Sequence, residues 1–151
     1  MTVRVQTEDF DAGAEINRMR LSRADTGAVA AFIGQVRDLN QGDKVSTLTL
    51  EHYPGMTEKA LEGIVEQAKQ RWNVFDVLVV HRIGTLQPTE QIVLVVVSGA
   101  HRGEAFAACE FIMDYLKTEA PFWKKEQTPA GERWVEARVS DDAARERWAK
   151  K

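Results

Sequence analysis

Apolar residues recur along this chain with two periods, one helical and one typical of strands. From Met56 to Trp72 they recur at helical spacing, and His101–Lys117 repeats that spacing. Both stretches therefore predict amphipathic helices. Shorter helices are expected at Asp9–Leu21, where an aspartate can cap the first turn, and at Asp141–Ala149.

Runs of β-branched and small residues predict the strands. Val74–Val80 and Gln91–Ser98 are apolar on consecutive positions, which is typical of strands covered on both faces. Gly27–Arg37 likewise indicates a buried strand. Further strands are expected at Thr2–Gln6 and Val45–Tyr53, and in a hairpin of Phe122–Gln127 and Arg133–Arg138 around Pro129-Ala130-Gly131. Turn-forming residues predict connections at 38–43 and between Gly84 and Pro88.

Helices and strands alternate through the middle of the chain. This order predicts an α/β or α+β fold, with helices packed on a mixed sheet and a C-terminal hairpin. No long linker, low-complexity tract or internal repeat divides residues 1–151, so we expect a single domain. A domain of this length buries roughly 70% of the surface of its unfolded chain, which is enough for a stable core without disulfides or metals.

Composition excludes several classes of function. The 20 basic and 23 acidic side chains give a net charge of -3, so no strong field attracts nucleic acid or an anionic membrane. Cys109 is the single cysteine, which rules out an internal disulfide and a cysteine-rich zinc site. We find no His-Glu-x-x-His and no Gly-rich phosphate loop, and we expect neither metal nor cofactor. No signal-peptide-like or membrane-spanning run occurs, which favours a cytoplasmic protein.

The first candidate for chemistry is the pair His101-Arg102 at the start of a predicted helix. Cations are mildly unfavourable at that end of a helix dipole. Unpaired amides together with an arginine form a good site for a phosphate or carboxylate. A surface pair bonded to a neighbouring loop explains the same residues equally well.

The second candidate combines Lys117 with the segment 120–126. On a helical wheel Lys117 flanks the apolar stripe, and Arg102 falls on the same side. A lysine in the last turn can also simply extend into solvent. In an extended segment Lys124 and Lys125 point to opposite faces, so one of them can approach Lys117 beside Phe122 and Trp123. Clustered cations lower the pKa of a lysine and suit it to acid–base work. A solvated Lys-Lys pair is the ordinary alternative.

Other polar residues carry weaker signals. Arg37 ends Gly34-Gln35-Val36-Arg37 and can reach a pocket rim, although a structural salt bridge is the ordinary explanation. His52, His81 and His101 lack the spacing of metal ligands. Cys109 lies within a helical apolar stripe, which indicates a core residue rather than a nucleophile.

Several stretches, in order along nearly the whole chain, resemble the molybdopterin synthase large-subunit family. The matching segments are Gly-Ala-Val-Ala-Ala-Phe-Ile-Gly-Gln-Val-Arg (27–37), Leu-Glu-His-Tyr-Pro-Gly-Met (50–56), His-Arg-Ile-Gly (81–84), Ala-His-Arg (100–102), Asp-Tyr-Leu-Lys-Thr-Glu-Ala-Pro-Phe-Trp-Lys-Lys-Glu (114–126) and Trp-Val-Glu-Ala-Arg (134–138). The 114–126 string is specific, and the N-terminal segment up to Ser22 carries none of these motifs.

The resemblance implies an α/β hammerhead-type fold and a sulfurtransferase of molybdenum cofactor biosynthesis. Its members form a homodimer, and a small ubiquitin-like subunit docks at each end to give a heterotetramer. The Gly-Gly tail of that subunit ends in a thiocarboxylate and enters a pocket of the large subunit. The substrate is cyclic pyranopterin monophosphate, or precursor Z, which receives two sulfurs to become molybdopterin.

The resemblance also implies roles for particular residues. Lys117 and Lys124 match catalytic lysines. Residues that match substrate- or anion-binding positions are Arg37, His101, Arg102, Phe32 as a pocket wall, and Arg138, which would reach the pocket of the neighbouring subunit. The alternative is a module without catalytic activity, whose basic pocket holds a partner's C-terminal tail or a phosphate metabolite.

Overall fold

The computed structural model describes residues 2–135 and 139–149. Its helices are α1 (Ala12–Leu21), α2 (Met56–Arg71), α3 (Arg102–Glu119) and α4 (Val139–Ala149). Its strands are β1 (Thr2–Gln6), β2 (Ala28–Gln35), β3 (Leu39–Asn40), β4 (Asp43–Lys44), β5 (Thr47–His52), β6 (Val74–Arg82), β7 (Gly84–Leu86), β8 (Gln91–Gly99), β9 (Phe122–Thr128) and β10 (Gly131–Val135). The predicted α/β class, the four helices and the C-terminal hairpin are therefore present.

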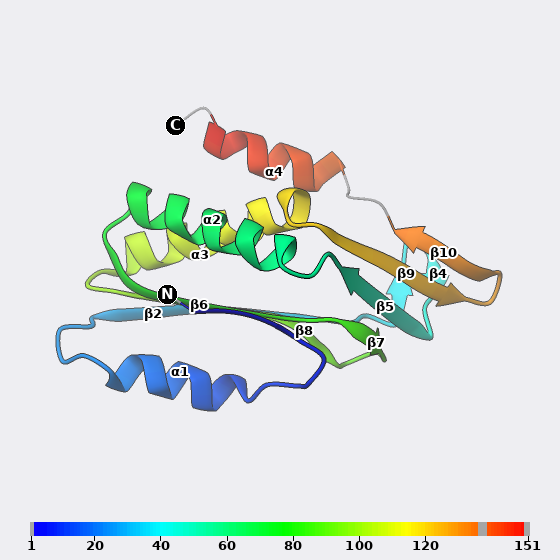
Figure 1. Cartoon of the computed structure of the whole chain (residues 1–151), viewed down its shortest axis with the longest axis horizontal. Helices are drawn as coiled ribbons and strands as arrows, with labels where there is room; N and C mark the ends of the chain where they lie inside the picture. The colour runs from blue at the N-terminus through cyan, green and yellow to red at the C-terminus, as the bar shows by residue number, and fades with distance from the viewer. Residues whose placement is uncertain (1, 136–138, 150–151) are drawn as a thin grey trace.

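The first sheet has the strand order β1-β6-β8-β2 and is mixed, as the sequence predicts. β1 runs parallel to β6, whereas β6 and β2 are antiparallel to β8. α1 covers one face of the sheet, and α2 and α3 cover the other (Figure 1). Alternate residues of the central strands β6 and β8 point to opposite faces of the sheet. Val79 and Val95 pack with α2 and α3 on one face, and Val80 and Leu94 pack with α1 on the other. The expectation that these two strands are covered on both faces is confirmed.

The strand at Gly27–Arg37 differs from the prediction in its burial. Among the residues that the structure describes, β2 lies at the edge of the sheet and pairs only with β8. Phe32 and Ile33 are 41% and 42% exposed, so the expectation of a buried strand is wrong within a single chain. Apolar composition alone does not distinguish a central strand from an edge strand, because that distinction depends on pairing with distant segments.

The C-terminal hairpin belongs to a second, antiparallel sheet with the order β10-β9-β5-β7. This sheet lies at the end of the molecule to which the C-terminal end of α3 points (Figure 1). The predicted connection at 38–43 is in fact part of the short hairpin β3–β4, which turns at Gln41 (φ 53°) and Gly42 (φ 82°). Positive φ at both turn residues matches the twist of a tight hairpin. Strands as short as β3, β4 and β7 leave no readable period in the sequence.

A buried hydroxyl fixes the corner between α3 and β9. Thr57, in the first turn of α2, donates to the carbonyl of Pro121 at 3.0 Å. The same oxygen accepts from the backbone N–H of Tyr53 at 3.0 Å. Thr57 has no exposed surface, so these bonds are shielded from water. They hold the beginning of β9 against the start of α2.

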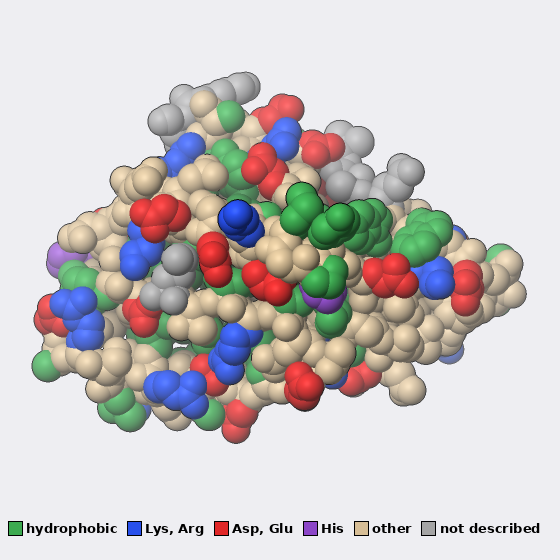
Figure 2. Space-filling view, viewed as in Figure 1, with side chains coloured by type: hydrophobic (Ala, Val, Ile, Leu, Met, Phe, Trp, Pro, Cys, Tyr) green, Lys and Arg blue, Asp and Glu red, His purple; other side chains and the backbone are tan. Residues whose placement is uncertain are grey.

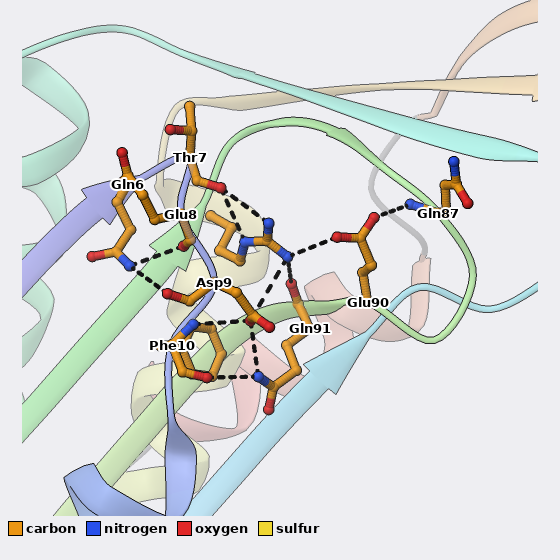
Figure 3. Close-up of polar contacts among 9 residues, drawn as sticks. Gln6, Thr7, Glu8, Asp9, Phe10, Gln87, Glu90 and Gln91 are labelled. Atoms are coloured by element: carbon orange, nitrogen blue, oxygen red, sulfur yellow. Dashed lines mark hydrogen bonds and ion pairs between the residues drawn. The ribbon is translucent and has the colours of Figure 1, made fainter.

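Arg82 ties the segment after β1 to the central strands. Figure 3 labels its partners Thr7, Glu90 and Gln91. Its guanidinium donates to the carbonyl of Thr7 at 3.0 Å and to that of Gln91 at 3.1 Å, and it pairs with Glu90 at 3.3 Å. The Arg82 side chain is only 8% exposed. Nearby, a hydrogen bond from Gln91 is the main cause that holds the pKa of Asp9 below its usual value. Arg82 is thus a structural residue, and its contacts fix the end of β6.

Replacing Arg82 by methionine should lower the free energy of unfolding by about 2–4 kcal/mol. The substitution leaves the carbonyls of Thr7 and Gln91 without their buried donor. Urea unfolding followed by circular dichroism measures the change. Arg18→Met is the matched control, because the Arg18 side chain is 69% exposed and, within the described ranges, pairs only with Glu15 on the same helix. Its loss should cost under about 0.5 kcal/mol. Equal losses in the two variants would contradict the structural role of Arg82.

Candidate active site

A cleft of about 630 Å³ opens where the two sheets meet the end of α3. It is lined by the end of β2, by β6, β8 and β9, and by the last turn of α3. Its basic residues are Arg37, Lys117 and Lys124, and its apolar walls include Phe32, Ile92, Leu116 and Phe122. Cations with apolar walls form a site suited to an anionic ligand that carries a hydrophobic or aromatic body.

Lys117 reaches the cleft from the last turn of α3. Its neighbour Leu116 and the preceding-turn residue Met113 are buried, whereas Lys117 is exposed and lines the cleft. The lysine therefore flanks the apolar stripe as predicted. No ion pair of Lys117 occurs within residues 2–135 and 139–149.

β9 divides its residues between two faces. Lys124 pairs across the sheet with Leu50 and lines the cleft. Lys125 lies on the opposite face, 3.5 Å from Glu132 and 5.4 Å from the centre of the Trp134 ring. The prediction that the two lysines face opposite ways is thus confirmed. The same alternation places Trp123 on the outer face, where it is 47% exposed, so its expected role as a wall of the cleft is wrong.

His81 is a residue of the cleft that the sequence did not reveal. It is 2% exposed, and its ring stacks on Phe122 with the centroids 3.7 Å apart. The pKa of His81 is lowered to about 3. Burial is the main cause, and the charges of Lys124 and Lys117 contribute to the same decrease. A histidine inside the apolar run of β6 is the one signal that could have indicated it.

A polar network holds the β3–β4 hairpin at the rim of the cleft. Glu126 is 6% exposed and accepts from Asn40 at 3.0 Å and from Arg133 at 3.1 Å. Arg133 also pairs with Asp43 in β4 at 2.6 Å. The charges of Glu126 and Arg133 compensate one another at a place where an unpaired carboxylate would be costly. The network fixes the wall that contains Leu39 and Asn40.

Arg37 and Phe32 enter the cleft from the edge strand and the turn that follows it. Val36 is buried and anchored by backbone hydrogen bonds to Glu90 and Thr89. Arg37 is exposed, and within the described part of the chain it forms no ion pair. The alternative of a structural salt bridge is therefore not supported for this arginine.

His101 and Arg102 lie at the opposite end of α3 from Lys117 (Figure 1). At 1.5 Å per residue, the backbones of Arg102 and Lys117 are about 22 Å apart along the helix. His101 and Arg102 line a separate surface hollow together with Gly27. A single chain thus does not bring them to the cleft, although the helical wheel placed Arg102 on the same side as Lys117. Arg138 lies outside the described residues.

Among the described residues, neither Cys109 nor the acidic side chains form a second candidate site, either for a nucleophile or for a metal ion. Burial raises the pKa of the Cys109 thiol to about 11, which agrees with the prediction of a core residue. Over the described ranges 2–135 and 139–149, no cluster of His, Cys, Asp and Glu could hold a metal ion. Within the same ranges, no helix is long and apolar enough to cross a membrane. The basic cleft is therefore the best-supported site for chemistry.

Comparison with known proteins decides the family. A sequence model described as MoaE protein matches residues 5–119. The molybdopterin synthase catalytic subunit of Ralstonia nicotianae is 66% identical over 147 residues, which is 97% of this chain and 84% of the relative. The chain belongs to the MoaE family, the family of molybdopterin synthase catalytic subunits. The family resemblance read from the sequence motifs is confirmed.

Solved structures of MoaE proteins share the fold. A molybdopterin biosynthesis MoaE protein from Burkholderia ambifaria superposes with a TM-score of 0.84 at 59% identity and covers 98% of this chain and 97% of its own. A chain from a complex of subunits 1 and 2 of the Helicobacter pylori molybdopterin-converting factor has a TM-score of 0.73 at 20% identity, with 90% and 91% covered. The second likeness shows the fold alone.

The buried thiol of Cys109 should be nearly unreactive in the folded protein. At pH 8, a pKa of about 11 leaves roughly one thiol in a thousand ionised, and burial hinders reagents further. We expect Ellman's reagent to react at least about a hundredfold more slowly with the native chain than with the chain unfolded in urea. Similar rates in both states would contradict the burial of this residue.

Proposed function

We propose that this MoaE-family chain is a sulfurtransferase that converts precursor Z into molybdopterin. The two sulfurs would come from the C-terminal thiocarboxylate of a small ubiquitin-like subunit. The main support is one observation: Lys117 and Lys124, from a helix end and a separate strand, line the same cleft beside the ring of Phe122. The cytoplasmic location expected from the sequence is part of this proposal.

The charges of the cleft suit the proposed chemistry. A thiocarboxylate is an anion, and its sulfur must attack a carbon of the pterin while a bond to oxygen breaks. Lys117 and Lys124 would stabilise the negative charge that develops on oxygen, and one of them would donate a proton as the cyclic phosphate opens. Phe32 and Phe122 would supply apolar walls for the pterin ring, and Arg37 would bind the phosphate.

A second copy of the chain would complete the site. β2 has an open edge within the described residues, with Phe32 and Ile33 exposed on it. The start of β2 adjoins the hollow of His101 and Arg102, because Gly27 lines that hollow, and the end of β2 leads to Arg37. A two-fold axis through the middle of β2 would pair the strand with its own copy in antiparallel fashion.

Element lengths support this dimer. β2 has 8 residues, which span about 26 Å at 3.3 Å per residue. The distance between Arg102 and Lys117 along α3 is about 22 Å. The two lengths are similar, so a strand paired antiparallel with its copy would bring the Arg102 end of one chain close to the Lys117 end of the other. Antiparallel pairing would therefore carry His101 and Arg102 of one subunit to the cleft of the other. The predicted set of anion-binding residues would then meet across the dimer rather than within one chain.

The small subunit is the third component of the proposal. The structure from Helicobacter pylori is a complex of two subunits of a molybdopterin-converting factor. We infer a two-subunit assembly for this chain from its membership of the MoaE family, whose curated relatives are named as the catalytic subunit of molybdopterin synthase. An extended Gly-Gly tail is narrow enough to enter a cleft between two sheets, and its terminal charge would meet the two lysines. One small subunit on each end of the dimer would give the heterotetramer.

Lys117→Ala and Lys124→Ala should each reduce molybdopterin formation by about 100-fold or more, because each removes a charge that contacts the reacting groups. Lys125→Ala is the matched control. It removes the same charge one position along β9, but on the outer face, and should keep activity within about threefold. Product formation is assayed with the thiocarboxylated partner after thermal unfolding confirms the fold. Near-normal turnover of Lys117→Ala would contradict the proposal, and tail binding without any product from the wild type would favour the binding-module alternative.

Mixing two inactive variants tests whether the site is shared. If each cleft uses Lys117 of one subunit and Arg102 of the other, a mixed dimer of the Lys117→Ala and Arg102→Ala variants has two different clefts. One cleft lacks both residues, and the other has both. Random exchange of subunits should therefore restore about a quarter of wild-type activity. If both residues acted within one chain, mixing would restore nothing. Native mass spectrometry with one variant labelled with nitrogen-15 confirms that mixed dimers form.

A further inference from the structure

His81 is a buried polar side chain in the wall of the cleft to which the proposed reaction assigns no role. It is 2% exposed, yet it lines the cleft. Its ring lies almost parallel to that of Phe122, with 17° between the planes. A buried ring held by stacking has little rotational freedom, so its two nitrogen atoms point in fixed directions.

The contacts of the ring fix its tautomer. Nδ1 lies 2.8 Å from the backbone carbonyl oxygen of Arg82. A carbonyl oxygen can only accept, so Nδ1 carries the hydrogen and Nε2 carries a lone pair. The backbone at this position is itself held, because the Arg82 side chain bonds to Thr7 and Gln91 (Figure 3). The geometry thus presents Nε2 as an acceptor.

Nε2 remains an acceptor near neutral pH. Burial is the main cause that lowers the pKa of the ring to about 3, and the hydrogen bond to Arg82 opposes this only in part. The charged or titratable groups that act on the ring are Lys124, Lys117 and His52, and all three disfavour its protonation. His81 therefore cannot serve as a general acid or base near neutral pH.

The other charged side chains that line the cleft are the donors Arg37, Lys117 and Lys124 and the acceptors Glu126 and Asp141. Lys117 and Arg37 have no acceptor atoms on their side chains. The carboxylate of Glu126 is already engaged by Asn40 and Arg133. Within the described residues, Nε2 of His81 has no hydrogen-bond partner, and it is not among the polar atoms sealed from solvent. The cleft thus contains an unused acceptor near two ammonium groups.

We propose that His81 is a ligand-binding residue whose Nε2 accepts a hydrogen bond from an N–H group of the bound ligand. This inference rests on the proposed function, which brings two sources of such a group to the cleft: the pterin ring and the amides of the Gly-Gly tail. A buried acceptor favours a ligand that brings a donor and disfavours one that leaves the acceptor unpaired. His81 would therefore add selectivity that the cationic residues cannot supply.

Two substitutions separate the acceptor from the packing. In His81→Asn the short amide can still donate to the Arg82 carbonyl, but no acceptor reaches the position of Nε2. In His81→Gln the longer side chain places an amide oxygen near that position. Loss of one ordinary hydrogen bond corresponds to about a tenfold loss of affinity.

Calorimetry measures the affinity for two ligands in separate arms of the experiment. One arm uses precursor Z, and the other uses a peptide ending in Gly-Gly. We expect His81→Asn to weaken one arm by about tenfold and His81→Gln to recover most of that loss. The arm that weakens identifies the source of the N–H group. Unchanged affinity in both arms, or equal losses in both variants, would overturn the inference.

The wild-type protein provides a test that does not depend on how a variant folds. Nitrogen-15 NMR of the histidine rings reports Nδ1 and Nε2 separately, and the chain has only 3 histidines to assign. Addition of the bound ligand should shift the Nε2 resonance of His81 towards that of a hydrogen-bonded acceptor and leave Nδ1 protonated. Saturation of the cleft without a shift of Nε2 would overturn the role of His81 alone. Failure of the wild type to bind either ligand would instead count against the proposed function.

Discussion

The hydrogen-bond ladder between β5 and β9 is the contact on which the geometry of the cleft depends. It pairs His52 with Phe122 and Leu50 with Lys124, and so fixes which residues of β9 face inward. The turn at Pro121 joins this ladder directly to the end of α3, where Lys117 lies. A shift of the register by one residue would turn Lys125 into the cleft and Lys124 out to solvent. Residues that stabilise the ladder and its corner therefore also control the chemistry.

Several buried polar groups support that arrangement from outside the cleft. Thr57 holds the corner at Pro121, Glu126 holds the β3–β4 hairpin at the rim, and Arg82 holds the end of β6. Each of these groups is hydrogen-bonded within the chain, which offsets the cost of burying it. Together they position the basic residues of the cleft from three sides, which is the preorganisation that electrostatic catalysis requires.

Local periodicity predicted the parts of the site that depend on local geometry. The opposite orientations of Lys124 and Lys125 follow from the two-residue period of a strand, and the position of Lys117 follows from the helical period. The burial of β2 could not be read in this way, because its place at the sheet edge is set by pairing with β8. His81 was missed because its environment comes from Phe122, which lies far away in sequence. The wheel placed Arg102 beside Lys117 in angle but ignored their separation along the helix.

Arg102 and Lys117 lie too far apart along α3 to act in the same cleft of one chain. If both act on one substrate, a second chain must supply Arg102. One chain supplies the lysines and Arg37, and an antiparallel β2 pair would bring the remaining cations from a second chain. Such a site would link catalysis to dimer formation, because the cleft of one subunit alone would lack the residues at the start of α3.

A structure of the chain bound to its small subunit tests the central claim most directly. The distance from the terminal carbon of the Gly-Gly tail to the Nζ atoms of Lys117 and Lys124 is the quantity to measure. We predict that the tail lies inside the cleft, with its terminal group about 3–4 Å from at least one of these atoms. A tail bound on the outer face of β9, beside Trp123 and Lys125, would contradict the account.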